Sequence, residues 1–231
     1  MFAKNAEMLD IDLSSVDYGV LSHAHYDHSD GMDTFFSLNS KAPLLVRNSS
    51  GENCFGIEDG ALKYIGIRKG LLKEYDSRIK FIDGVYEIDK DIWLIPHHDK
   101  DYSPIAKRNN LYICLGGKCI PDSFSHEQSL VIGTEAGLVI FNSCSHTGMT
   151  NILEDVNQAL GRADVFAYVG GLHLFKMTDP ELETLSSEIN SSGIEHILTG
   201  HCTGDHAYGY LHGKFGNRIM QFHSGFTCVL P

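Results

Sequence analysis

Short apolar runs, separated by glycines and charged residues, recur along most of this chain. The runs lie at 18–21, 43–46, 80–82, 92–95, 111–114, 130–132, 138–141, 165–169 and 196–199. Runs of this length bounded by turn residues predict buried β-strands. The segment Gly133-Thr134-Glu135-Ala136-Gly137 between two of them predicts a β-hairpin over 129–142.

Helical spacing of apolar residues predicts one helix over 152–160 and another over 182–189. The second follows Thr178-Asp179-Pro180-Glu181, in which a capping threonine precedes an early proline and a glutamate three positions on. A further helix is expected to begin at Asp27, because acidic residues follow it and the apolar residues over 32–36 share one side. Strands interspersed with helices predict an α/β (α+β) fold in which two sheets pack as a sandwich.

The 231 residues contain no low-complexity linker, so we expect a single domain over 1–231. The segment from about 47 to 110 has a different texture, with many glycines and charges, and is interpreted as a cap-like insertion beside the site. His97 and His98, which lie in this segment, are interpreted as solvated loop residues and not as ligands.

Composition narrows the classes of function. Apolar residues make up 42% of the chain and charged residues 21%, which is typical of soluble globular proteins. Neither a run long enough to cross a bilayer nor the apolar core of a signal peptide is present, so we expect a cytoplasmic protein without a membrane partner. The formal net charge of −12 argues against nucleic acid as a partner, because phosphate backbones bind basic surfaces.

The six cysteines form no Cys-x-x-Cys pair and no dense framework, which predicts reduced thiols and neither a zinc knuckle nor a disulfide scaffold. Cys144 and Cys202 stand apart, because each lies within two positions of a histidine that we interpret as a metal ligand.

Candidate chemistry concentrates in Ser22-His23-Ala24-His25-Tyr26-Asp27-His28, directly after the first apolar run. His23 and His25 are two positions apart, so in extended backbone their side chains point the same way and can bind one ion. Asp27 and His28, at the start of a helix, can face a second ion. Divalent metals accept such mixed nitrogen and oxygen ligands, whereas packing these groups without a metal would bury unpaired polar atoms.

This segment resembles the His-x-His-x-Asp-His signature of the metallo-β-lactamase superfamily. Four later segments resemble one branch, the metal-dependent hydrolases that include the dihydropterin ribofuranosyl-aminobenzene phosphate synthases. They are Phe124-Ser125-His126-Glu127-Gln128-Ser129-Leu130, Asn142-Ser143-Cys144-Ser145-His146-Thr147-Gly148, Gly170-Gly171-Leu172-His173-Leu174 and Thr199-Gly200-His201-Cys202-Thr203-Gly204. The resemblance covers nearly the whole chain.

The resemblance implies a metallo-β-lactamase-like αββα sandwich of two mixed sheets flanked by helices, with one or two metal ions at its edge. Members of the branch usually carry leading strands and an Asp-Thr-Gly turn before the segment that begins here at Phe2. Either the chain starts inside a longer protein or the sandwich lacks its N-terminal strands. An exposed sheet edge would favour pairing with another chain, as in a homo-oligomer.

The resemblance also implies a ligand set, with two alignments open at its centre. His201 fits the last histidine of the superfamily. An alignment on the hairpin turn puts His126 first and Ser143-Cys144-Ser145-His146 in the place of the aspartate turn, whereas an alignment on the glycine after the histidine puts His146 first and His173 where the aspartate would be. The predicted ligands are His23, His25, Asp27, His28, His126, His146 and His201.

Within that set His146 is favoured over His126, for which a role in orienting a ligand is the alternative. His173 is a ligand, the acid that protonates the leaving atom, or a buried structural residue.

These residues predict a metal-dependent hydrolase in which a metal-bound hydroxide attacks an ester, phosphoester or related small molecule. Asp27 would take the proton or orient the nucleophile, and His173 would act as the acid. Zinc is the favoured ion, with manganese and iron as alternatives.

Two other functions compete. One is a pterin-linked synthase that releases pyrophosphate, which would use the same site on a phosphorylated or pterin-like substrate. The other is a non-catalytic metal-binding module.

Overall fold

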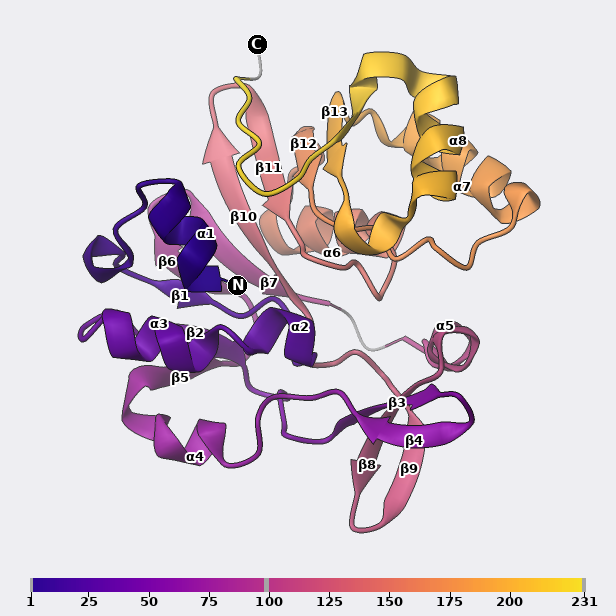
Figure 1. Cartoon of the computed structure of the whole chain (residues 1–231). Helices are drawn as coiled ribbons and strands as arrows, with labels where there is room; N and C mark the ends of the chain where they lie inside the picture. The colour runs from indigo at the N-terminus through magenta and orange to yellow at the C-terminus, as the bar shows by residue number, and fades with distance from the viewer. Residues whose placement is uncertain (1, 98–99, 230–231) are drawn as a thin grey trace.

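Two β-sheets pack face to face at the centre of the molecule, and helices cover the outer face of each (Figure 1). The computed structural model describes residues 2–97 and 100–229. The layers run helix, sheet, sheet, helix, which confirms the αββα sandwich predicted from the sequence.

The smaller sheet is built from three parallel strands in the order β1-β2-β5. Their bounds are β1 Gly19–Val20, β2 Leu44–Arg47 and β5 Ile79–Ile82. The helices on this side of the sandwich are α1 Phe2–Met8, α2 Tyr26–Ser29, α3 Met32–Leu38 and α4 Leu71–Glu74.

The larger sheet has seven strands in the order β14-β13-β12-β11-β10-β7-β6. Its strands are β6 Tyr86–Asp89, β7 Ile92–Pro96, β10 Gln128–Thr134, β11 Gly137–Phe141, β12 Val165–Val169, β13 His196–Thr199 and β14 Ile219–Gln221. Strands β11 to β14 are parallel, whereas β10, β7 and β6 add antiparallel pairs, so this sheet is mixed. Its outer face is covered by α6 Met149–Leu160, α7 Asp179–Ser192 and α8 Asp205–Phe215.

Three apolar layers hold these elements together. One lies between the two sheets and includes Leu45, Ile82 and Leu94. The largest lies between the seven-stranded sheet and α6 to α8, and a third lies between the small sheet and α3 and α4. Full burial of each such side chain contributes about 1.5–3 kcal/mol, so these layers supply the main driving force for folding.

A third sheet, in the order β4-β3-β8-β9, lies beside the sandwich next to α5 (Figure 1). These elements are β3 Cys54–Glu58, β4 Ala61–Tyr64, α5 Ser103–Asn109, β8 Leu111–Leu115 and β9 Lys118–Pro121. The segment 47–110 is therefore divided, because β3, β4 and α5 lie outside the sandwich while β5, β6 and β7 belong to its two sheets. A cap-like role for the outer part stays a prediction.

The hairpin forms as expected, with Leu130 of β10 opposite Phe141 of β11. Both long helices contain their predicted segments, and α7 has the predicted capping box, in which the Thr178 and Glu181 side chains cap each other's backbone. Strands β3, β4, β6, β9 and β14 were not predicted. Most of their residues are partly or fully exposed, so they lack a continuous apolar run.

The expectation that all cysteines are reduced thiols is wrong for one pair. Cys114 and Cys119 face each other across β8 and β9 and form a disulfide. A β-hairpin brings cross-strand neighbours close enough to form a disulfide. The sequence criteria used above look for Cys-x-x-Cys pairs or many closely spaced cysteines, so they do not detect a single cross-strand pair.

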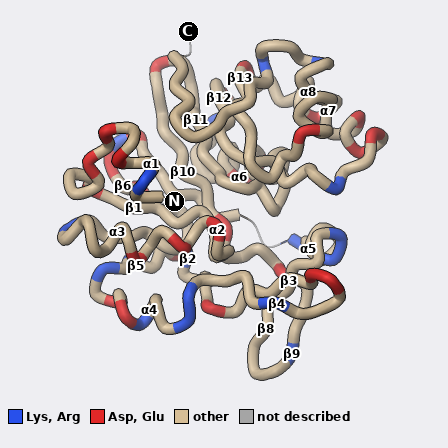
Figure 2. Tube along the Cα trace, viewed as in Figure 1, with Lys and Arg blue, Asp and Glu red and all other residues tan. Residues whose placement is uncertain are grey.

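Acidic residues outnumber basic ones by 30 to 18, and Figure 2 shows Asp and Glu spread along the chain with Lys and Arg interspersed among them. Among the described residues, none of the helices is both long and apolar enough to cross a bilayer.

Candidate metal centre

The histidine-rich segment follows β1 and is fixed by contacts with β10. The backbone N–H of Gln128 donates to the carbonyl of Ser22 at 2.9 Å, and its side-chain amide donates to Leu21. Helix α2 begins at Tyr26 with His25 at its N-cap, so Asp27 and His28 lie in the first helical turn, close to the predicted helix start.

His23, His25 and His146 form the first donor group. Their ring centroids are 4.7–4.8 Å apart, and the Nε2 atoms of His23 and His146 are 3.3 Å apart. Burial, followed by repulsion from the neighbouring imidazoles, lowers the pKa of both His23 and His146 well below the usual value. The rings are therefore neutral near pH 7 and keep the lone pairs that a metal ion needs.

Asp27, His28 and His201 form the second group beside it. The Asp27 carboxylate lies 3.3 Å from His28 Nε2 and 3.2 Å from His201 Nε2, and these two nitrogens are 3.2 Å apart. Although partial burial opposes ionisation, hydrogen bonds with His201 and His28 hold the pKa of the Asp27 carboxyl far below its usual range. The hydrogen bond between Asp27 and His201 also raises the pKa of His201.

The loop after β11 carries His146 and is held by side-chain acceptors. Asn142 Oδ1 accepts the backbone N–H of Cys144 at 3.2 Å and of Ser145 at 2.7 Å. The buried Glu127 carboxylate accepts the backbone N–H of His146 at 2.8 Å, and it also accepts the backbone N–H and the hydroxyl of Thr147. Ser145 has a left-handed φ of 55°, a strained conformation that is common at functional sites.

Two thiols lie between and beside these groups. Cys144 Sγ is 3.2 Å from His28 Nε2 and 3.4 Å from Cys202 Sγ. Cys144 is close enough to both groups to share an ion with His23 and His28, or with His201 and Cys202. Cys144 thus supplies a sulfur donor from the segment that one alignment put in place of the aspartate turn.

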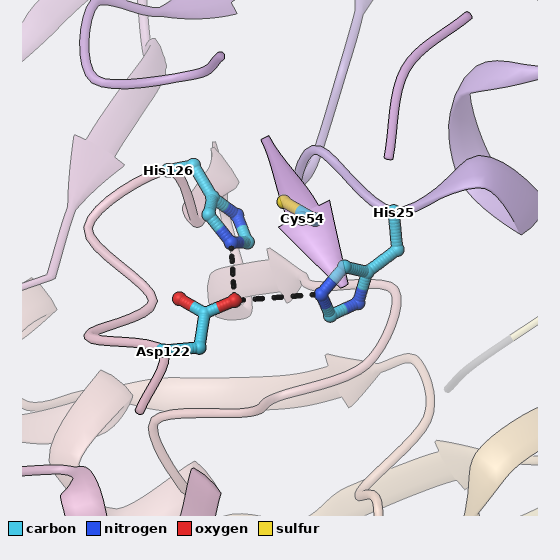
Figure 3. Close-up of side chains that lie close together, drawn as sticks. All are labelled: His25, Cys54, Asp122 and His126. Carbon is cyan, nitrogen blue, oxygen red and sulfur yellow. Dashed lines mark hydrogen bonds and ion pairs between the residues drawn. The ribbon is translucent and has the colours of Figure 1, made fainter. Parts of the chain in front are cut away.

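His126 lies behind His25 and belongs to a separate group with Cys54 and Asp122 (Figure 3). Its Nδ1 accepts the backbone N–H of Ala24 at 3.2 Å, and its Nε2 is 3.1 Å from the Asp122 carboxylate. Neither Cys54 nor Asp122 was predicted as a site residue from the sequence. The spacing of four residues between Asp122 and His126 was a weak signal, whereas nothing around Cys54 indicated its position.

His173 lies next to His146, with ring centroids 4.3 Å apart. Its φ is 50°, and neither ring nitrogen has a hydrogen-bond partner among the described residues. Both histidines line a pocket of about 300 Å³, within the usual size range for small-molecule sites. The pocket's other lining residues include Ile105, Arg108, Met149, Asn151, Leu172, Leu174, Met177 and Leu185.

The interpretation of His97 as a solvated residue is wrong. Its side chain is 1% exposed and lies 3.2 Å from the Asp155 carboxylate. Its other nitrogen is 3.2 Å from both Ser129 and Asn142. His97 is buried because α6 places Asp155 over the end of β7. Local sequence does not predict this contact between distant segments. His98 lies outside the described residues.

The donors present fit divalent metal ions. Nitrogen, carboxylate and thiol groups converge within 4.8 Å in several combinations, and His25 Nε2 and His146 Nδ1 are buried without hydrogen-bond partners. A neutral imidazole buried without a partner costs free energy that ligation of a metal would recover.

Comparison with known proteins places this fold in a family. No protein-family profile matches the chain. The crystal structure of Tm1679, described as a metal-dependent hydrolase of the β-lactamase superfamily, is 30% identical, with a TM-score of 0.83 over 99% of this chain and 84% of that one. CmlA β-hydroxylase, at 10% identity and a TM-score of 0.52, covers 91% of this chain and 44% of its own and shows the fold alone.

Two curated relatives come from Methanocaldococcus jannaschii. One is 7,8-dihydropterin-6-methyl-4-(β-D-ribofuranosyl)-aminobenzene-5'-phosphate synthase, 26% identical over 96% of this chain and 78% of its own. The other is the uncharacterized protein MJ0448, 28% identical over 81% of this chain and 69% of its own. The chain therefore belongs to the metallo-β-lactamase superfamily, in the branch that contains this pterin-linked synthase.

Proposed function

We propose that this protein is a metal-dependent hydrolase of small molecules. The observation that carries the proposal is the pairing of two donor groups, His23, His25 and His146 beside Asp27, His28 and His201, with His146 also lining the pocket. Segments far apart in the sequence supply these side chains, and a purely structural role would not explain why their nitrogens face one another.

We assign His23, His25 and His146 to a first ion and Asp27, His28 and His201 to a second, with zinc as the favoured metal. Bound divalent ions would lower the pKa of a water molecule and stabilise the negative charge that develops during hydrolysis. The lowered pKa of Asp27 keeps its carboxylate ionised, so it can bind an ion and orient the attacking water.

His173 is suited to donate a proton to the leaving atom. It lies on the pocket wall beside His146, and its two ring nitrogens are buried without hydrogen-bond partners among the described residues. A general acid needs a nitrogen that reaches the substrate, so the ring would turn toward the pocket when substrate binds. The apolar lining from Ile105, Met149 and Leu172 would hold the body of a flat or apolar substrate. Arg108, which pairs with Glu181 at 2.8 Å, would contact an anionic group such as phosphate by exchanging that partner.

A synthase that releases pyrophosphate is the second candidate. It is favoured by the similarity to the pterin-linked synthase over 96% of this chain. In that reaction the same ions would stabilise the departing pyrophosphate, so substrate choice and not the donor set separates the two functions.

The proposal is tested by metal content and turnover in three variants. His25→Ala and His201→Ala should each lose bound metal and turnover of phosphoesters, lactones or pterin diphosphates while the circular dichroism spectrum stays unchanged. His173→Gln should lower the rate by about 100-fold or more, the usual contribution of a general acid, with metal content unchanged.

Exposed His206, which pairs with Asp179 away from the site, supplies the matched control as His206→Ala. Full metal content in both His25→Ala and His201→Ala would refute the assignment, and loss of metal in His173→Gln would make His173 a ligand.

A further inference from the structure

Four side chains that can bind metal converge next to the first donor group, in a cluster of which the proposed hydrolysis uses only His25. They are His25, Cys54, Asp122 and His126, and each offers a donor atom within 4.8 Å of the others (Figure 3). They come from the histidine-rich loop, from the start of β3, and from the loop between β9 and β10. We infer that these four residues form a separate, buried metal site of structural type, selective for zinc.

Closure is the first argument for a structural site. Cys54 is 0% exposed, Asp122 1%, His126 2% and His25 4%. Structural zinc sites take four protein ligands of this kind and leave no position for solvent, whereas catalytic sites keep one position open. Sulfur together with two imidazoles favours zinc over magnesium or calcium, which prefer oxygen ligands.

The donor spacing is the second argument. Asp122 Oδ2 lies 3.1 Å from His126 Nε2 and 3.6 Å from His25 Nε2. Zinc–ligand bonds of about 2.0–2.3 Å in a tetrahedron place neighbouring donors about 3.3–3.8 Å apart, so both separations are close to what zinc requires. A distance of 3.6 Å is too long for a hydrogen bond, and His25 Nε2 is buried without a hydrogen-bond partner.

The hydrogen bonds around the cluster show what a bound ion would change. His126 Nδ1 accepts the backbone N–H of Ala24, so in the metal-free protein the neutral ring carries its proton on Nε2, which donates to Asp122 Oδ2 at 3.1 Å. Zinc at Nε2 would displace that proton to Nδ1 at the expense of the bond with Ala24. Asp122 Oδ1 accepts the backbone N–H of Phe124 at 2.7 Å, which leaves Oδ2 to face the cluster. The His126 ring and the Asp122 carboxylate are thus each held by the backbone, with Nε2 and Oδ2 facing the cluster.

The charges of the cluster also suit a divalent ion. The buried Asp122 carboxylate has the His126 and His25 imidazoles as its basic partners in the cluster. A divalent ion bound by the Asp122 carboxylate and the Cys54 thiolate makes the cluster electrically neutral, which removes the cost of burying an uncompensated charge.

This ion would tie the outer sheet to the catalytic loop. Cys54 begins β3 in the outer sheet, and His25 pairs with Gly66 in an isolated bridge beside it. Binding of the buried ion through Nε2 would fix the orientation of the His25 ring, which also belongs to the first donor group. A second ion at Nδ1 would require the ring to lose its remaining proton and become an imidazolate bridge.

The test uses the full chain with Cys144 and Cys202 both replaced by serine, so that Cys54 is the thiol nearest to any bound ion. The protein is stripped with a chelator and reloaded with cobalt(II) or zinc. We expect the cobalt form to show a thiolate-to-metal charge-transfer band, and adding Cys54→Ser should abolish the band and remove one equivalent of metal. Cys228→Ser, at an exposed cysteine, is the matched control and should change neither.

His126→Gln should also remove one equivalent of metal, which provides a second variant if Cys54→Ser does not fold. X-ray absorption at the zinc edge of the Cys144→Ser/Cys202→Ser protein requires no change in the cluster and should show a Zn–S distance of about 2.3 Å. Absence of sulfur from the zinc shell, or unchanged metal content and spectrum in Cys54→Ser, would overturn the site and leave the four residues as hydrogen-bonding support for His25. Loss of metal in His201→Ala without loss of the charge-transfer band would separate this site from the proposed catalytic ions.

Discussion

Glu127 allows a stringent test of how the loop that carries His146 is held. Its side chain is 0% exposed, and its two carboxylate oxygens accept three hydrogen bonds from the loop that follows β11. Oε1 accepts the backbone N–H of His146 at 2.8 Å, and Oε2 accepts the backbone N–H and the hydroxyl of Thr147 at 3.0 and 2.7 Å. Removing the carboxylate would leave these buried donors without an acceptor, because water cannot reach them.

The cost follows from the number of unsatisfied donors. A buried N–H without an acceptor costs about 1–3 kcal/mol, so Glu127→Ala, which strands two, should lower the free energy of unfolding by about 2–6 kcal/mol. Glu127→Gln keeps one carbonyl oxygen, which can serve both donors of Thr147. It strands only the N–H of His146 and should cost about 1–3 kcal/mol.

Urea unfolding of chelator-treated protein measures this cost without a contribution from bound metal. The order expected is parent, Glu127→Gln, Glu127→Ala, with an unchanged dependence on urea concentration. Glu135→Ala, in the exposed turn of the β10–β11 hairpin, should stay within about 0.5 kcal/mol of the parent. A Glu127→Ala variant as stable as this control would refute the prediction.

Two further outcomes are expected. Gly170→Ala should abolish folding, because a Cβ there would lie 1.6 Å from the carbonyl oxygen of Asn142 and φ is 151°. Gly209→Ala, with open space around it on α8, should instead stabilise the protein by up to about 1 kcal/mol. Equal solubility and equal melting temperatures of the two variants would contradict this. On acidification the ion at His201 should leave before the ion at His146, because the pKa of His201 is raised and that of His146 is lowered, so protons displace metal from His201 at the higher pH. Metal content measured against pH checks the order, and release of both ions in one step would count against it.

Much of this protein follows from local sequence. Apolar runs predicted all the long central strands, because strands buried on both faces need continuous apolar residues. Thr178 and Glu181 predicted the start of α7, since capping is a contact between near neighbours in the chain. The histidine-rich segment likewise indicated metal binding, because alternation in extended backbone already places His23 and His25 on one side.

Contacts between distant segments were decided by the tertiary structure alone. Sequence left His126 and His146 as alternatives, and packing separated them by directing His146 toward His23 and His126 toward Asp122. Cys54 entered a donor cluster only because β3 lies against the histidine-rich loop. A side chain's chemistry is local, but its partners depend on how loops at the ends of different strands meet, and no periodicity along the chain encodes that meeting.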